Sequence, residues 1–283
     1  MLLLAVAVRP AAAQMNLVGE WSPRYHEDQP ERIPGPELGD YTGLPITDGA
    51  RLAADSWDAS RLTLPEHQCK VHNAPYIYHG PLQFRVSEER DLRTQKVIAY
   101  KHYINTYEQE RTIWMDGRPH PSKNAPHDQT GFTTGVWNGN ELVTTTTHLK
   151  AGYMRRNGAA SSDQATITMH FRRHGNMLTA TMIMEDPVYL TEPYILSRAY
   201  SLSTNPVSIG GPPCIVGDEG VEEGRVPHYL PGENPFTNEM TKIYGIPVEA
   251  AMGGADTMYP EYRDKIKDKF KYPTEKCKQN CGG

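Results

Sequence analysis

The clearest pattern in this sequence is an alternation of apolar and polar side chains along two neighbouring segments, 165–173 and 177–185. A period of two residues is typical of a β-strand with one buried face. His174-Gly175-Asn176 separates the segments and is the kind of short, glycine-containing loop that joins hairpin strands. We therefore predict a hairpin with a methionine-rich inner face. The predicted inner side chains are Ile167, Met169, Phe171, Leu178, Ala180, Met182 and Met184.

Similar segments fill the chain from Val71 to about Leu202, and Gly, Asn and Pro separate them. Asn138-Gly139 favours a type I′ turn, and 90–95 suits a longer hairpin loop. Short strands at this spacing are typical of an antiparallel sandwich or barrel. We predict a mainly β fold with an antiparallel, calycin- or lipocalin-like barrel of about eight strands. The predicted strands are Tyr76–His79, Leu82–Glu88, Lys96–Ile104, Arg111–Met115, Phe132–Trp137, Glu141–Leu149, Ala165–Arg173, Met177–Glu185 and Tyr194–Leu202.

The segments on either side of 71–205 have a different character. Residues 14–70 are rich in proline and glycine, and we expect an irregular N-terminal arm there. Its helix candidate is Thr47–Trp57, with Thr47 or Asp48 as the N-cap. Residues 206–283 are expected to form a C-terminal extension of loops and short helices. Those helices are predicted at Asn234–Tyr244 and Pro260–Phe270.

Residues 1–13 read MLLLAVAVRPAAA, a short apolar run that ends in an Ala-x-Ala site. This pattern predicts a secretory signal peptide, and hence a periplasmic or secreted protein. Away from it, the sequence has no run of the roughly 20 apolar residues that a membrane-spanning helix needs. The four cysteines fit an exported protein. We expect one disulfide between Cys69 and Cys214 and a local one between Cys277 and Cys281.

The net charge of −5, without long runs of like charge, argues against nucleic acid or an anionic membrane as the main partner. The sequence has no G-x-S-x-G, G-x-x-x-x-G-K, G-x-G-x-x-G or H-E-x-x-H motif, so we expect no organic cofactor. His67, Cys69 and His72 are metal-ligand residue types at close spacing. A disulfide at Cys69 would exclude it as a ligand, and we predict no metal site.

A polar loop held between predicted strands, within 111–148, is the strongest candidate for a functional site. Asp116-Gly117 favours a tight turn, and Arg118 beside it a surface ion pair. The alternative is an anion clamp in which a histidine acts as acid or base near neutral pH. We predict that a polar end of a ligand contacts Arg111, His120, His127 and His148, and that its apolar part contacts Trp114, Phe132, Met182 and Met184.

The strand predicted at Glu141–Leu149 contains Thr144-Thr145-Thr146-Thr147 and is polar on both faces. If both faces are enclosed, the inner hydroxyls need hydrogen-bond partners, which a lined cavity would supply. In that case His148, Arg111 and Tyr103 are expected to converge. Glu185 and Asp186 are a poor catalytic pair, because adjacent strand residues point to opposite faces. A strand-ending turn at Asp186-Pro187 is the stronger interpretation.

Three motifs carry a resemblance to a known family: RTIWMDGRPHP at 111–121, GFTTGVW at 131–137, and Leu142-Val143 followed by Thr145-Thr146. They resemble a family of uncharacterised exported proteins of environmental Gram-negative bacteria, and the likeness extends from Gly19 to about Lys265. The family pattern has Trp-Glu-Gly-Asp where this chain has Trp137-Asn138-Gly139-Asn140, so two carboxylates are missing here. The resemblance implies export, but no activity and no catalytic residues.

These observations lead to three hypotheses. The first is an exported protein that binds a small apolar or aromatic molecule in a β-barrel cavity. The second is an acid/base enzyme (a lyase, isomerase or hydrolase) that works at the same cavity without a cofactor. The third is a structural subunit of an extracellular or periplasmic assembly, with protein contacts through the N-terminal arm or the C-terminal tail. Whether the protein is an enzyme stays open at this stage.

Overall fold

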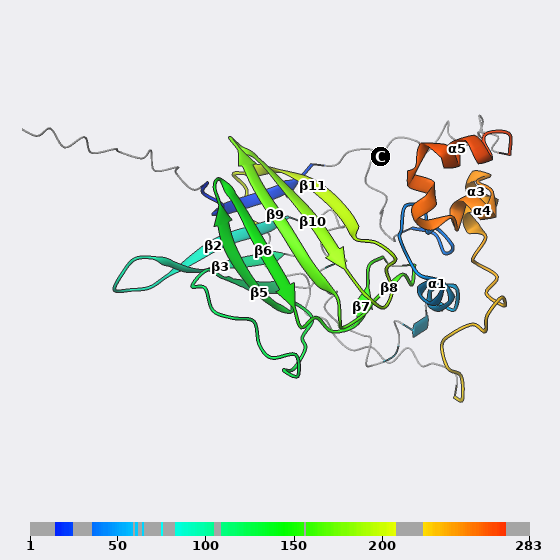
Figure 1. Cartoon of the computed structure of the whole chain (residues 1–283), viewed down its shortest axis with the longest axis horizontal. Coiled ribbons are helices and arrows are strands. Elements are labelled where there is room, and N and C mark those ends of the chain that lie inside the picture. Colours follow the sequence, from blue (N-terminus) through cyan, green and yellow to red (C-terminus); the bar gives the residue numbers. More distant parts are fainter. Residues whose placement is uncertain are drawn as a thin grey trace, which may run out of the picture.

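A computed structural model describes residues 15–24, 36–58, 60–61, 64, 75, 83–104, 109–155, 157–207 and 223–269 (Figure 1). The predicted signal peptide and all four cysteines lie outside these residues. So do His67, His72 and the strand expected at Tyr76–His79. The expectations attached to them remain predictions.

The chain forms a closed β-barrel of nine strands in the order β1-β11-β10-β9-β6-β5-β4-β3-β2. This confirms the predicted mainly β, calycin-like barrel, with one more strand than expected. A two-stranded sheet, β7-β8, lies outside it. The strands are β1 Gly19–Pro23, β2 Phe84–Arg90, β3 Val97–Ile104, β4 Gln109–Trp114, β5 Phe132–Asn138, β6 Glu141–Thr147, β7 Gly152–Tyr153, β8 Ala160–Ser161, β9 Thr166–His174, β10 Met177–Glu185 and β11 Tyr194–Ser203.

The barrel departs from a purely antiparallel arrangement at one place. β4 and β5 pair in parallel, with Ile113 opposite Thr133 and Trp114 opposite Thr134. A parallel pair needs a long crossover, and the loop 115–131 supplies it. This loop is the polar segment that the sequence marked as a candidate site.

The barrel is closed by β1, a strand from the segment expected to be an arm. β1 pairs with both β11 and β2, and Trp21 lies opposite Leu202 on one side and Phe84 on the other. The Trp21 ring is fully buried, and its indole N–H donates to the Leu17 carbonyl, 3.0 Å away. One buried aromatic side chain thus fixes the strand that completes the barrel.

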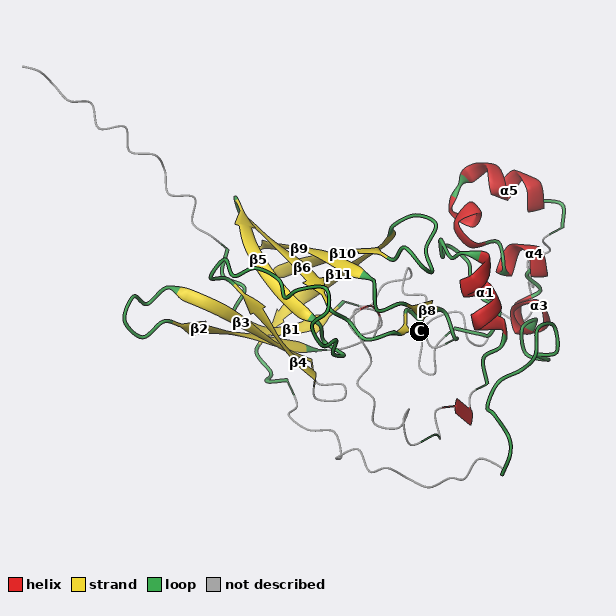
Figure 2. Ribbon diagram, turned by 60° about the horizontal axis from the view of Figure 1, so that its bottom comes forward, coloured by secondary structure: helices red, strands yellow, loops and turns green. Residues whose placement is uncertain are grey.

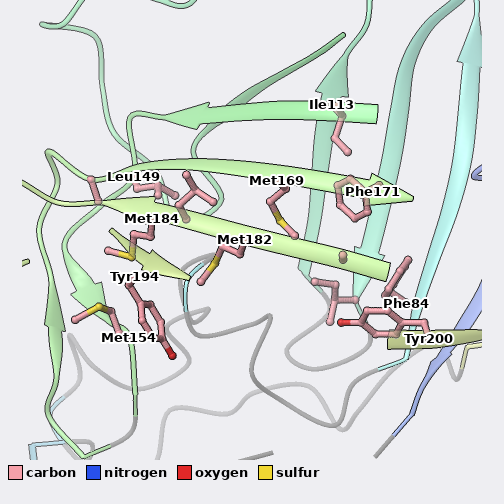
Figure 3. Close-up of a cluster of buried hydrophobic side chains, with 14 of the residues drawn as sticks. Phe84, Ile113, Leu149, Met154, Met169, Phe171, Met182, Met184, Tyr194 and Tyr200 are labelled. Atoms are coloured by element: carbon pink, nitrogen blue, oxygen red, sulfur yellow. The ribbon is translucent and has the colours of Figure 1, made fainter. Parts of the chain in front are cut away.

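The predicted inner face of β9 and β10 is confirmed. Met182 and Met184 are 1% and 0% exposed, and both belong to the main core (Figure 3). Burial of a side chain of this size contributes about 1.5–3 kcal/mol, so this face is a major source of stability. Two predicted hairpin turns are also present, with positive φ angles at Gly139 (62°) and Gly175 (58°).

The helix predicted in the N-terminal segment is α1, Asp48–Asp55. The Thr47 hydroxyl caps it by accepting from the Ala50 amide, 3.2 Å away. Ala50, Ala54 and Leu44 are all buried in the same core cluster as the barrel interior. The described part of the arm therefore packs onto its own barrel.

The other helices belong to the C-terminal extension and lie with α1 beyond one end of the barrel (Figure 2). They are α3 Glu239–Tyr244, α4 Val248–Ala251, η3 Gly254–Met258 and α5 Pro260–Ile266. α3 begins later than predicted because Asn234 is held elsewhere, donating to the carbonyls of Asp55 and Trp57. Among the described helices, none has the length and apolar character needed to cross a membrane.

Candidate functional site

The barrel wall separates the residues that the sequence analysis grouped into one site. On β4, Arg111 and Ile113 are buried inside, while Trp114 is half-buried on the outer face. His120, His127 and His148 lie under or within the loop 115–131, outside the wall. Tyr103 follows His102 on β3 and therefore points to the opposite, outer face, where its ring contacts the Arg85 guanidinium. Arg111, His148 and Tyr103 therefore do not converge.

Inside the barrel, Arg111 is paired with a histidine that sequence reasoning missed. Its Nε donates to Nδ1 of His102, 3.1 Å away. Because a guanidinium cannot accept a hydrogen bond, this contact fixes His102 as neutral, with its proton on Nε2. Burial lowers the pKa of His102 to about 3 and that of Arg111 to about 9. Desolvation disfavours the charged form of both groups.

Arg198 and Tyr200 are also buried, on β11, and Tyr200 lies near both Arg111 and Arg198. Burial raises the pKa of Tyr200 to about 12, so its phenol stays protonated. The Tyr200 ring packs edge-on against Phe84, with 4.7 Å between ring centroids, and Phe84 packs in the same way on His102, at 4.6 Å. The only feature of the sequence that pointed to His102, Arg198 and Tyr200 was the two-residue alternation of β3 and β11, which puts them on the same face as apolar side chains.

The threonine strand β6 has two different faces. Thr144 and Thr146 point inward and are fully buried, whereas Thr145 and Thr147 are half-buried on the outside. Thr146 shares a hydrogen bond of 2.8 Å with Thr133. The Thr144 hydroxyl has no hydrogen-bond partner among the described residues. The inner hydroxyl of Thr146 therefore has the hydrogen-bond partner that burial requires, and the inner hydroxyl of Thr144 has none among the described residues.

Thr144 lies beside the arginine. Its neighbour across the strands is Met169, and the Met169 sulfur is 3.6 Å from Nη2 of Arg111. Arg111 on β4 and Met169 on β9 come from strands separated by β5 and β6, so side chains from different walls meet inside the barrel. The interior at this level contains the Arg111 guanidinium, the His102 imidazole, the Thr144 hydroxyl and soft apolar side chains. Met182 and Met184 belong to the hydrophobic core cluster of the barrel.

Outside the wall, two histidines and two threonines form a continuous hydrogen-bond chain. His148 Nε2 is 2.8 Å from the Ser122 carbonyl, and its Nδ1 is 2.7 Å from the Thr147 hydroxyl. The same hydroxyl is 2.8 Å from Nδ1 of His120, whose Nε2 is 2.8 Å from the Thr134 hydroxyl. No acidic side chain takes part in these contacts.

The direction of each bond in this chain follows from its carbonyl end. A carbonyl only accepts, so His148 Nε2 donates to Ser122, and neutral His148 then accepts at Nδ1 from Thr147. The Thr147 oxygen in turn accepts from His120 Nδ1. His120 Nε2 is left as the acceptor of the Thr134 proton. The chain is therefore directed from Thr134 to Ser122 when both histidines are neutral.

Burial, and then repulsion from His148, hold the pKa of His120 below its usual value, which favours the neutral form. Phe132 packs edge-on against His120, with 5.3 Å between ring centroids. His127 donates from Nδ1 to the Leu149 carbonyl, 2.9 Å away, and its ring centroid is 5.2 Å from that of His148. Phe132 and the three histidines are thus the predicted site residues that come together.

The backbone at His148 is unusual. Its φ is +58°, a region that residues other than glycine seldom occupy. β6 ends at the preceding residue, Thr147, and the His148 carbonyl accepts from the Asp128 amide, 2.9 Å away. The turn at His148 thus ends the predicted strand early and aims the imidazole into the loop.

Trp114 does not join this cluster. The Arg118 guanidinium stacks on its ring, 3.4 Å from the centroid, and also binds Asp116 with two nitrogens. That pair holds the pKa of the Asp116 carboxyl below its usual range. The turn interpretation of 116–118 is supported, since the Asp116 carboxylate accepts from the Arg118 amide.

Two other expectations from the sequence concern carboxylates and metals. Asp186 is a turn residue, because its carboxylate accepts from the Ser162 amide and hydroxyl and from the amides of Val188 and Tyr189. Within the described ranges, no three His, Cys, Asp or Glu side chains are grouped to hold a metal ion. His120 and His148 use both ring nitrogens in the chain, so ligation by either would break it.

Comparisons of this chain with models of protein families, with curated proteins and with solved structures found no match. The site is therefore interpreted from its own geometry alone.

Proposed function

We propose that this protein binds a small, mainly apolar or aromatic molecule inside its barrel and that Arg111 binds an acidic group of that molecule. The observation that carries the proposal is the Arg111 guanidinium, 5% exposed, which lies inside the barrel against the His102 imidazole and the Met169 sulfur. A guanidinium binds a carboxylate or sulfonate through two parallel hydrogen bonds, and such a contact is strongest away from water.

Neighbouring groups support the same ligand chemistry. Arg198 adds a second positive charge, and Thr144 offers a hydroxyl with no partner among the described residues. The contact between Arg111 and Met169 is the part of the packing that a ligand would replace. Methionine side chains repack at low cost, which favours such an exchange. Met182 and Met184 would then line the apolar end.

The test uses anilinonaphthalene sulfonate, an aromatic anion that fluoresces when bound in an apolar site. We expect binding to the native protein and at least about tenfold weaker binding to Arg111→Met, since a hydrogen-bonded charge contributes about 1.5–3 kcal/mol. The matched control is Arg85→Met, an arginine on the outer face of β2. Equal affinity in the two variants would overturn the proposal, provided circular dichroism finds both folded.

A second candidate function is acid/base catalysis on the outer wall. The Thr134 hydroxyl donates to a neutral imidazole that Thr147 orients, and this is the arrangement of an activated nucleophile with its base. An activated ester such as p-nitrophenyl acetate tests it. Turnover that falls to the same residual level in His120→Ala and Thr134→Val would favour this function. Turnover that survives both substitutions would exclude it.

The proposal also includes export. It rests on the Ala-x-Ala site within 1–13 and on the cysteine content. Mass spectrometry of protein from the periplasm or medium should find the chain starting at Gln14. Peptide mapping without reduction should find Cys69 joined to Cys214. A full-length chain confined to the cytoplasm would contradict this part of the proposal.

A further inference from the structure

Both ends of the barrel are closed by buried side chains, so neither end offers an open path to Arg111. At the end with the β9-β10 turn, Trp21 is fully buried, and the Arg173 guanidinium lies over its ring. At the opposite end, the buried Met154 lies beside Met184 and Tyr194 (Figure 3), and the helices lie beyond them (Figure 2). A ligand that binds Arg111 therefore needs a route through the wall.

The wall is held by the fewest backbone hydrogen bonds where β4 meets β5. In the described chain these strands pair only at Ile113–Thr133 and Trp114–Thr134, whereas β9 and β10 pair along their whole length. Residues 109–112 of β4 pair with β3. A parallel ladder is also slightly less stable per residue than an antiparallel one. The β4-β5 junction is therefore a place where the wall opens at low cost.

Arg111 lies beside this junction. It precedes Ile113 by two residues, faces inward like Ile113, and belongs to the part of β4 that extends past the pairing with β5. On the other side of the junction, a Cβ at Gly135 would lie 2.6 Å from the Met115 sulfur, so the inner packing consists of a flexible side chain against a glycine. An opening here leads directly to the guanidinium.

Histidines fasten the loop 115–131, which connects the two strands of the junction. His148 donates from Nε2 to the Ser122 carbonyl, and the Thr147 hydroxyl bridges His148 to His120. These bonds are complete when both histidines are neutral. If both are protonated, the Thr147 oxygen faces two N–H donors, and its own proton loses the acceptor on His148. Protonation therefore weakens the fastening of the loop.

Protonation also places like charges side by side. The ring centroids of His127 and His148 are 5.2 Å apart, and a single hydroxyl joins His148 to His120. Burial, and then repulsion from His148, already hold the pKa of His120 below its usual value. A histidine released into water titrates at about 6.5, so the open loop binds a proton on His120 more readily than the closed loop does. Acid therefore favours the open loop.

The charges around the histidines do little to offset this repulsion. Both carboxylates of the loop, Asp116 and Asp128, accept bonds from groups within the loop itself. On β6, Glu141 lies at the far end and is bound to Arg172. The other charged side chains on the outer side of the loop and its neighbouring strands are Glu110, Lys101, Lys123 and Lys150. Lysines outnumber carboxylates in this last group.

We propose that the ligand enters the barrel sideways, through the β4-β5 junction, and that acid opens this route by protonating the histidines that fasten the loop 115–131. The inference rests on the proposed function, because it requires a ligand that reaches Arg111. It predicts that the protein takes up its ligand faster at acidic than at neutral pH.

Stopped-flow fluorescence with anilinonaphthalene sulfonate measures the rate of entry. The pKa of Arg111 is about 9 and that of His102 about 3, so neither inner group changes its charge between pH 7.5 and pH 5.5. We expect the association rate constant to rise at least about threefold at pH 5.5, since each histidine that must be neutral in the closed loop contributes up to about tenfold. An unchanged or slower association at pH 5.5 would overturn the proposal.

A variant that cannot take up these protons separates the loop from a general effect of acid. His120→Gln combined with His148→Asn should lose the pH response, and asparagine tolerates the positive φ of +58° at position 148. The matched control is His170→Gln, an outer-face histidine of β9 that contacts Glu141, and it should keep the response. A response that persists in the double variant, or disappears in the control, would contradict the proposal.

Hydrogen exchange of the native protein tests the opening without a ligand. The amides of Asp128 and Lys150 bond between the loop and the end of β6. Their protection factors should fall from pH 7.5 to pH 5.5 by more than those of β10, and an equal change would overturn the proposal. If the dye binds at neither pH, the proposed function fails and the entry route fails with it. Dye binding that depends on Arg111 but has the same association rate at both pH values overturns the entry route alone.

Discussion

The two sides of a single strand, β6, contain the same residue type in opposite situations. Inside the barrel, Thr144 and Thr146 are fully buried next to apolar side chains, and one hydroxyl pairs while the other has no described partner. Outside, Thr147 joins two histidines and ties the loop 115–131 to the wall. The inner face therefore determines stability and the outer face the position of the loop.

Histidines inside and outside the barrel wall also differ in their environment. His102, inside, is fully buried beside a guanidinium, and its pKa falls to about 3. His120, outside, is half-buried, and its pKa is lowered less strongly, by burial and by His148. The pH dependence of stability is therefore expected to come more from His102 than from His120.

The largest expected effect comes from one pair of neighbours on β10. Met182→Ala should lower the free energy of unfolding by about 2–5 kcal/mol, because it removes buried atoms and leaves a cavity. Thr181→Ala, one residue earlier on the outer face, should cost less than about 1 kcal/mol. Urea unfolding of both variants measures the difference. Similar losses would mean that the barrel interior is not the main core.

The next effect is the pH dependence caused by His102. Its folded pKa of about 3 lies below the unfolded value of about 6.5. The unfolded chain therefore binds the proton first, and stability falls as the pH drops from 6.5 towards 3. Between pH 7 and pH 5 the contribution is about 2 kcal/mol.

His102→Gln removes this titration while keeping an acceptor for Arg111. Urea unfolding at pH 7 and pH 5 should give a smaller drop in this variant than in the native protein. His120→Gln serves as the comparison on the outer face and should change the drop less. The same pH dependence in His102→Gln and the native protein would show that other groups cause it.

A smaller effect is expected when the outer chain is broken at its centre. Thr147→Val removes the hydroxyl between His120 and His148 and should cost about 1–2 kcal/mol. Hydrogen exchange of amides in 115–131 should become faster. The control is Thr145→Val, on the same face of the same strand and without a hydrogen bond to a histidine of the described chain. Unchanged exchange in Thr147→Val would mean that backbone contacts alone hold the loop.

The smallest effect is expected at the inner hydroxyl without a described partner. Thr144→Val should change the free energy of unfolding by less than about 1 kcal/mol, and in the stabilising direction, since it removes a buried polar atom. Thr146→Val should destabilise, because it leaves Thr133 without its bond. Urea unfolding of the two variants checks the sign. A clear loss of stability in Thr144→Val would reveal a partner for its hydroxyl.

Much of the fold was predictable, because it is determined by interactions between residues that are close in the sequence. The alternation in 165–173 and 177–185, the turns at Gly139 and Gly175, and the Thr47 cap all reflect interactions between residues close in the chain. Closure of the barrel was harder to predict from the sequence. It depends on β1 pairing with β2 and β11, strands far away in sequence, and on a parallel β4-β5 contact.

The candidate site was predictable only in part. His120, His127, His148 and Phe132 lie together because they belong to the loop 115–131 and to the β5-β6 hairpin that follows it. Arg111 was grouped with them because it is near in sequence, yet the parity of β4 directs it to the other side of the wall. Its true neighbours, His102 and Tyr200, come from β3 and β11.

The sequence by itself determined that this chain forms a β-barrel with a methionine-rich inner face, since a two-residue period fixes which side chains share a face. Only the tertiary structure decided which polar residues lie inside. Alternation divides Thr144 from Thr145 and His102 from Tyr103, but it does not say which side becomes buried. Which side becomes buried is decided when strands distant in sequence close the barrel. Closure places Arg111 inside and leaves His120, His127 and His148 outside the wall.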